Sequence, residues 1–310
     1  MLPPNSLLSG AIRDLRFRRA VSPRDIRLPC NLAVPLGLFC YASRMGKCIF
    51  CSREAKLTGE HIWSAWIGRL FAPHTSGFNF SYYDTQTGAR REWSQPTMDQ
   101  TTNLVCQPCN EGWMSAIEAN AHRSLSGIVR DGSPVCLLPS GIVSLATFSF
   151  KCAILANHMA PNGEPFFSPF IRHRFKDNLE IASGVQMWIG DFQGIARWSG
   201  RWNLRYVKSS DDSTHDLEFY TFNFVAGRLT IQVIAKRWAK LHQRGRELPT
   251  VHFIPAWDEA LIEFCPAQVP SILWPPSKHF VDDSFDHLVD RLSGTATMSF
   301  SKQPTTYIRV

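Results

Sequence analysis

The chain has 310 residues, of which 44% are hydrophobic and 19% are charged, a composition that excludes an intrinsically disordered protein. At this length we expect one smaller and one larger domain. The formal net charge of +7 is of the kind found in nucleic-acid-binding proteins. Residues 1–44, however, hold seven arginines and two aspartates, so the other 266 residues carry a net charge of only +2. The overall charge therefore does not predict DNA binding by the body of the chain.

The cysteine content bears on the cellular compartment. Four of the nine cysteines form two Cys-x-x-Cys pairs, a spacing that favours metal thiolates in a reducing compartment over a disulfide scaffold. We find no run of about 20 apolar residues of the kind that spans a membrane. The nearest segment, Leu28–Ala42, is interrupted by prolines and an asparagine. We therefore expect a cytoplasmic protein with no membrane partner. The other five cysteines are expected to be small buried side chains: Cys30, Cys40, Cys136, Cys152 and Cys265.

Residues 1–44 differ from the rest of the chain. They are basic and interrupted by prolines, and they show no sustained hydrophobic periodicity. Two interpretations stay open for this segment: a loose N-terminal arm, or a mis-assigned start, with translation beginning at Met45. Mass spectrometry of the native protein distinguishes them, because peptides from within residues 1–44 contradict the second interpretation.

Residues 45–132 are predicted to form a small domain around the two cysteine pairs. Leu57–Ile62 is expected to be a strand, a hairpin is expected within about 76–95, and Thr101–Val105 is a connecting loop or strand. Pro108 is well placed to open a helix. The apolar residues of that helix recur at helical spacing along one face: Trp113, Ile117, Ala121, Leu125 and Ile128.

Residues 135–293 are predicted to form a larger α+β domain with an antiparallel sheet. Ser144–His158 is expected to be a buried apolar helix and Phe285–Leu292 a short last helix. Residues 294–310 are expected to be a mobile tail. The expected strands are Val185–Ile189, Trp202–Val207, and the hairpin pair Glu218–Val225 and Arg228–Ala235.

The chemistry of the chain is concentrated around the two cysteine pairs. Four thiolates in two short clips suit one tetrahedral structural zinc ion, with Cys48, Cys51, Cys106 and Cys109 as ligands. Next to these clips lie a carboxylate, an imidazole and an amide, those of Glu60, His61 and Asn110. Mg²⁺ prefers oxygen ligands, so Glu60 and Asn110 are candidate ligands of a second, catalytic ion. Because adjacent strand residues point to opposite faces, His61 is better placed to act on water or phosphate.

These spaced elements resemble the HNH, or ββα-metal, endonuclease family. The resemblance rests on Cys48-Ile-Phe-Cys51, Glu60-His61-Ile62, Asn103-Leu104 and Cys106-Gln-Pro-Cys109-Asn110. The most similar branch is the zinc-stapled one, which includes phage recombination endonucleases, and there is a looser similarity to bacterial HNH proteins. The resemblance implies a small zinc-stapled ββα-metal domain and a DNA phosphodiester hydrolase. It further implies His61 as general base, Asn103 as the residue that orients it, and Glu60 and Asn110 as ligands of Mg²⁺ or a similar ion.

The chain departs from the pattern of that family at several positions. Many family members have a second histidine four residues beyond the position of Asn110, where this chain has Met114. Methionine is a poor ligand for Mg²⁺, so water is expected to fill that coordination position. Arg90 and Arg91 are candidate phosphate contacts, although they equally suit a solvated strand edge.

Two other readings of the same residues stay open. The first is a catalytically inactive, zinc-stabilised module that binds nucleic acid or a protein. The second is a defence-type nuclease effector gated by the C-terminal domain, which differs from the main hypothesis only in substrate and trigger. DNA is the expected partner, RNA is an alternative substrate, and the sequence does not predict an oligomeric state.

Overall fold

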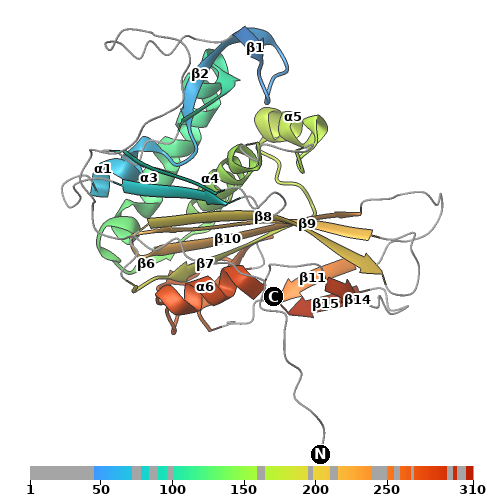
Figure 1. Ribbon diagram of the computed structural model, residues 1–310. Helices are drawn as coiled ribbons and strands as arrows, with labels where there is room; N and C mark the ends of the chain where they lie inside the picture. Colours follow the sequence, from blue (N-terminus) through green and yellow to red (C-terminus); the bar gives the residue numbers. More distant parts are fainter. Residues whose placement is uncertain are drawn as a thin grey trace, which may run out of the picture.

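A computed structural model of the chain describes residues 45–71, 78–83, 90–95, 101–158, 165–194, 198–209, 216–238, 250–254, 259–266, 269–291, 296–298 and 305–309. The expected loose N-terminal segment, 1–44, lies outside these residues. Within the described parts the chain combines helices with largely antiparallel sheets, which confirms the predicted α+β class. The elements stack in layers around a central sheet (Figure 1).

The N-terminal module, residues 45–131, holds the two cysteine pairs. Strands β1 and β2 form a hairpin, and β5 pairs with the other edge of β2, in the order β1-β2-β5. Helix α1 follows β2, and the short helices α2 and η2 run from β5 into the long helix α3. The bounds are β1 Met45–Lys47, β2 Glu54–His61, α1 Ala65–Phe71, β3 Phe78–Tyr83, β4 Arg90–Gln95, β5 Thr101–Cys106, α2 Gln107–Cys109, η2 Asn110–Met114 and α3 Ser115–Asp131.

Local sequence signals explain this module. Pro108 occupies the first turn of α2, where its missing N–H leaves no hydrogen bond unmade. Four residues of the predicted apolar stripe on α3 are buried: Ile117, Ala121, Leu125 and Ile128. Gly132 ends the helix in the left-handed conformation, with φ of 72°, which glycine adopts without steric cost. The expected hairpin within 76–95 is present as the antiparallel pair β3–β4.

A six-stranded sheet forms the centre of the molecule, in the order β12-β7-β10-β9-β8-β14. All neighbours are antiparallel except β14, which runs parallel to β8. Helices α3, α4 and α5 lie on one side of this sheet and α6 on the other (Figure 1). The bounds are β6 Val135–Leu137, α4 Pro139–Asn157, α5 Pro169–Asn178, β7 Val185–Asp191, β8 Trp198–Ser209, β9 Asp216–Ala226, β10 Leu229–Trp238, β11 Thr250–Ile254, β12 Leu261–Cys265, β13 Ile272–Trp274, α6 Asp282–Arg291, β14 Ala296–Met298 and β15 Thr305–Arg309.

Helix α4 is the central helix of the core. Within the described residues it is the one helix long and apolar enough, by length and composition, to cross a membrane, and 72% of that stretch is buried inside the protein. It contacts α3, β6, β10 and β12. The sequence-based expectation of no such apolar segment was therefore wrong on length and composition. The burial of α4 explains its apolar character without a bilayer.

One continuous hydrophobic cluster joins the N-terminal module to the sheet. Trp63, just after β2, stacks on Phe222 of β9 with ring centroids 5.6 Å apart and an interplanar angle of 13°. Trp66 of α1 packs against Phe148 of α4. The core therefore has no break at the domain boundary expected near residue 132.

The opposite face of the sheet has a mixed character. A second cluster of buried apolar residues, including Phe285 and Leu288 of α6, covers part of it. The same face carries a buried polar pair on β9 and β10: the Gln232 amide donates to Asn223 Oδ1 at 3.1 Å. Thr221 and Thr230 flank this pair and are also fully buried. Buried side-chain amides and hydroxyls on a sheet face are uncommon and require a specific arrangement of neighbours.

Residues 294–310, which were expected to be a mobile tail, contribute two strands among the described residues: β14, parallel to β8, and β15, parallel to β11. The β-branched and aromatic residues of Thr305–Arg309 favour extended structure once a neighbouring strand edge is available. The strand is therefore stabilised by its partner β11 rather than by a strong signal of its own.

Candidate metal centre

The four cysteines of the two pairs come together in one cluster. Cys48 and Cys51 lie on the turn between β1 and β2, while Cys106 ends β5 and Cys109 ends α2. Their sulfur atoms all lie within 4.8 Å of one another, and Cys51 Sγ is 3.6 Å from Cys106 Sγ. A tetrahedral ion with metal–sulfur bonds of about 2.3 Å requires sulfurs roughly 3.8 Å apart. The cluster therefore fits a single metal ion.

The surroundings of these sulfurs differ from one cysteine to the next. Burial raises the pKa of the Cys106 and Cys109 thiols. Burial also acts to raise the pKa of Cys48, but backbone hydrogen bonds from Cys106, Cys51 and Phe50 outweigh it and lower the pKa of this thiol. Buried thiolates need a compensating cation, and a bound metal ion deprotonates its thiol ligands. The arrangement is consistent with sulfurs that are anionic when a metal is bound.

Two residues of helix α5 form hydrogen bonds with the turn that carries the first cysteine pair. Arg172 Nε donates to the carbonyl oxygen of Ile49 at 2.9 Å, and Arg172 as a whole is 9% exposed. His173 Nε2 and Ser52 Oγ are 2.8 Å apart in a second hydrogen bond. Ser52 adopts a positive φ of 59°, an uncommon conformation for a residue with a side chain. The larger C-terminal part of the chain therefore holds the metal-binding turn in place.

Arg172 also donates a hydrogen bond to a neutral histidine, His158. His158 Nδ1 lies 2.9 Å from the carbonyl oxygen of Ile154, to which it donates, so Nε2 accepts from Arg172 Nη1 at 2.7 Å. Burial, together with the positive charge of Arg172, lowers the pKa of His158 to about 4, although the Ile154 carbonyl acts in the opposite direction. The imidazole is therefore uncharged at neutral pH.

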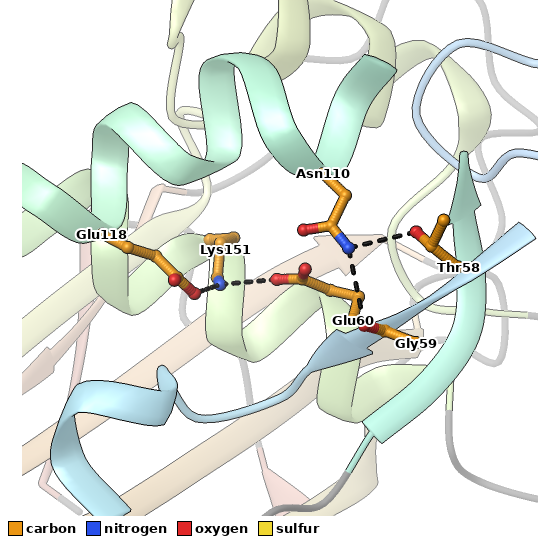
Figure 2. A network of polar contacts seen from close by, with 6 residues as sticks. All are labelled: Thr58, Gly59, Glu60, Asn110, Glu118 and Lys151. Atoms are coloured by element: carbon orange, nitrogen blue, oxygen red, sulfur yellow. Dashed lines mark hydrogen bonds and ion pairs between the residues drawn. The ribbon is translucent and has the colours of Figure 1, made fainter. Parts of the chain in front are cut away.

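Asn110 is hydrogen-bonded to the strand that carries Glu60. Its Nδ2 donates to Thr58 Oγ1 at 3.0 Å and to the carbonyl oxygen of Gly59 at 3.5 Å, as Figure 2 shows. The pairing of β2 with β5 is irregular at this point, between Thr58 and Glu60, and such irregularities redirect side chains. The Asn110 amide therefore lies beside Gly59 and close to Glu60, which is 50 positions away in the sequence (Figure 2).

Glu60 is engaged by a buried lysine. Lys151, from the middle of α4, places its Nζ 2.8 Å from Glu60 Oε1 and also forms an ion pair with Glu118 of α3. Lys151 is 0% exposed and Glu60 is 3% exposed. Figure 2 shows the ammonium group between the two carboxylates, with the Asn110 amide near Glu60. The three charges form a network that links β2, α3 and α4.

The electrostatics of this network follow from its burial. Burial raises the pKa of Glu60, and the nearby Lys151 only partly offsets the effect. Burial acts to lower the pKa of Lys151, but the charges of Glu60 and Glu118 outweigh it and raise that pKa. The lysine is therefore charged at neutral pH.

The other predicted site residues differ in their burial. His61 is the last residue of β2 and is half-buried, while its neighbour Glu60 is buried, consistent with side chains on opposite faces. Asn103 is exposed on β5, and its Oδ1 lies 3.9 Å from the position that a side-chain Cβ would occupy at Gly59. Met114 is 0% exposed in the core. Arg90 and Arg91 belong to β4, and their side chains lie outside the described residues.

Two residues that contact this region, Lys151 and Arg172, were not among the site residues predicted from the sequence. Lys151 is a lone charge in an apolar helix, and a buried charge requires a partner. That signal predicts an ion pair but does not identify the carboxylate, which lies 91 residues away. Arg172 lacked even this signal, because it stands in a polar segment, Arg172-His173-Arg174.

The Glu60 neighbourhood has the donor chemistry for a hard divalent ion. Glu60 and Asn110 provide carboxylate and amide oxygens, which Mg²⁺ and Mn²⁺ prefer. In the structure the cation in contact with Glu60 is the ammonium group of Lys151, which pairs with Oε1 of the carboxylate.

The chain was compared with protein-family models, curated proteins and solved structures, and no match was found in any of the three comparisons.

Proposed function

We propose that this chain is a metal-dependent endonuclease of the HNH type that hydrolyses DNA phosphodiester bonds. The observation that carries the proposal is the pair of hydrogen bonds from Asn110 to Thr58 and Gly59, which bring its amide to Glu60. The four-cysteine cluster supports it, because a zinc ion there would join the turn between β1 and β2 to the end of β5 and to α2, which leads into η2 and α3.

Each residue has a role in this proposal. His61, the last residue of β2, accepts a proton from the attacking water, and Asn103 orients His61 from the neighbouring strand. Glu60 and Asn110 would hold one Mg²⁺-like ion, and such an ion would supply positive charge to the phosphate and the leaving oxygen. Zinc bound by Cys48, Cys51, Cys106 and Cys109 is structural, since all four of its ligands are protein thiolates.

A second candidate function is favoured by the Lys151–Glu60 contact. An ammonium group at 2.8 Å from a nearly buried carboxylate is also the arrangement of a purely structural ion pair. In that case the module is a zinc-stabilised platform that binds nucleic acid or a protein without cleavage. RNA as substrate, or a role as a gated defence effector, would alter the substrate or trigger but not the chemistry at His61.

A plasmid-nicking assay with added Mg²⁺, Mn²⁺ or Ni²⁺ tests the proposal. The wild-type protein is expected to nick DNA only with a divalent ion, and His61→Ala is expected to lose at least about 100-fold of that rate. His279→Ala, which removes an exposed histidine outside the site, is the matched control and should retain the rate. If wild type and His61→Ala are equally inert on duplex, branched and single-stranded DNA and on RNA, the enzyme proposal fails and the binding-module proposal stands.

A further inference from the structure

Lys151 combines complete burial with a charge. Its residue is 0% exposed, and its Nζ contacts one oxygen of Glu60 and one of Glu118. Removing an ammonium ion from water costs several kcal/mol, and attraction to buried carboxylates offsets that cost only with good geometry. Hydrophobic residues in place of both Lys151 and Glu60 would avoid this cost, whereas the loss of Lys151 alone would leave a buried carboxylate without its partner. The charged lysine therefore calls for an explanation beyond stability.

The two carboxylates around Lys151 are not equivalent. Glu60 lies on β2 beside Asn110 and is nearly inaccessible, whereas the side chain of Glu118 on α3 is 26% exposed. The three residues come from three different elements, as Figure 2 shows. Glu118 can therefore keep a contact with Lys151 whether or not Glu60 does.

We propose that Lys151 is a resident cation that competes with the divalent ion for Glu60, and that Glu118 retains the ammonium group when an ion takes its place. This inference rests on the proposed function in one respect, the assignment of Glu60 as an ion ligand. Lys151 and Glu118 are positioning residues in this scheme, because they act through Glu60.

The charges of the network determine the sign of each effect. With Glu60, Glu118 and Lys151 ionised, the network carries one net negative charge. A divalent ion at Glu60 lies close to the ammonium group, so removal of that group by Lys151→Gln strengthens ion binding. Glu118→Gln leaves Lys151 with Glu60 as its one carboxylate among the described residues, so ion binding weakens. We expect about a tenfold change in Kd for each variant, equivalent to about 1.4 kcal/mol.

The binding of Mn²⁺ to the full-length protein measures these effects without any catalytic step. Titrations followed by calorimetry or by the electron paramagnetic resonance signal of free Mn²⁺ give Kd at pH 8, where a carboxylate with a raised pKa is more fully ionised. The double variant Lys151→Gln/Glu118→Gln completes a cycle. If Glu118 acts through Lys151, replacing Glu118 in the Lys151→Gln background should have less than about a twofold effect. Glu259→Gln is the control. It removes the same negative charge as Glu118→Gln, but from an exposed carboxylate on the surface, and it should leave Kd unchanged.

The outcomes separate this inference from the proposed function. Tighter Mn²⁺ binding by Lys151→Gln and weaker binding by Glu118→Gln support the competition. Weaker binding by Lys151→Gln overturns it, because a lysine that only fixes the geometry of Glu60 predicts that result. If Lys151→Gln fails to fold, an unchanged Kd in Glu118→Gln is sufficient to overturn it. The inference alone is refuted if the wild-type protein binds Mn²⁺ and nicks DNA, and both variants bind Mn²⁺ with the Kd of the wild type. Both proposals are refuted if the wild-type protein neither binds Mn²⁺ nor cuts DNA.

Discussion

Replacing Arg172 by methionine is expected to loosen the turn that carries the first cysteine pair. The guanidinium of Arg172 donates to the carbonyl oxygens of Ile49 and Phe167 and to His158 Nε2, at 2.9, 2.9 and 2.7 Å. Methionine fills much of the volume of the arginine stem but leaves these three acceptors without their donor. An unpaired buried acceptor costs at least about 1 kcal/mol, so we expect a loss of about 3 kcal/mol in the free energy of unfolding.

The estimate is placed at the low end of the range because burial lowers the pKa of Arg172. That shift reflects a desolvation cost of the guanidinium, which the methionine variant does not bear. A loss of about 3 kcal/mol is still a large share of the 5–15 kcal/mol that stabilises a typical domain. We also expect weaker zinc binding, by about tenfold or more, as is usual when residues that support metal ligands are removed.

Urea unfolding and zinc transfer to a chromogenic chelator measure these two effects. Arg174→Met is the matched control: Arg174 stands on the same helix, is half exposed and pairs with Glu180 on the surface, where ion pairs contribute about 1 kcal/mol or less. If Arg172→Met and Arg174→Met change stability and zinc release to the same extent, the hydrogen bonds of Arg172 do not stabilise the cysteine-bearing turn, and the reasoning is refuted.

Three further predictions concern other parts of the fold. Because His158 has a pKa of about 4 in the folded protein against 6.5 for the free side chain, the unfolded chain takes up its proton first as the pH falls. About 3 kcal/mol of stability, present above pH 6.5, should be lost between pH 6.5 and 4, and His158→Gln should flatten this part of the stability–pH curve. With zinc as the proposed ion of the four-cysteine cluster, Cys106→Ser should abolish both zinc binding and cooperative folding, as measured by metal analysis and circular dichroism. Gly227→Ala should destabilise by more than about 2 kcal/mol in urea unfolding, because Gly227 has a φ of 60° and its added Cβ would lie 1.8 Å from the carbonyl oxygen of Val129.

Each of these predictions has a control within the chain. Cys136→Ser alters an exposed cysteine outside the cluster and should leave metal content and folding intact; a stable, folded Cys106→Ser protein contradicts the structural-zinc assignment. Gly127→Ala, within helix α3, should stay within about 1 kcal/mol of wild type, and equal effects of the two glycine substitutions contradict the steric argument. If His158→Gln shows the same dependence of stability on pH as the wild type, groups other than His158 cause the loss of stability in acid.

The parts of the fold that were predicted from sequence are those with a strong local pattern. The apolar spacing on α3 and the alternation of β9 and β10 around Gly227 each repeat over several residues, so neighbours along the chain carry the signal. The cysteine cluster could also be predicted from the sequence, because the two cysteines of each Cys-x-x-Cys pair are close together along the chain. The short strand β14 has no such repeat and forms only in contact with β8.

The charged surroundings of the site could not be read from the sequence in the same way. Glu60 was recognised as a candidate ion ligand, but its contact with Lys151 spans 91 residues, and the contact of Arg172 with Ile49 spans 123. Such contacts depend on how α4 and α5 dock against the N-terminal module. The pattern of residues along the chain carries no information on how these helices dock. The partner of a lone buried charge can therefore be identified only in the structure.

The buried amide pair on the sheet has a consequence for the fidelity of folding. Asn223 and Gln232 are direct partners in the β9–β10 pairing and are joined by a hydrogen bond. A slip of one residue in either strand would turn its amide toward the opposite face, among Phe222, Phe224 and the apolar side chains of α4. In the native alignment Asn223 Nδ2 and Gln232 Oε1 already lack a partner among the described residues, so a slip would cost the one hydrogen bond that joins the pair, about 1 kcal/mol. The buried amide pair therefore favours the native alignment of β9 and β10 over an alignment shifted by one residue.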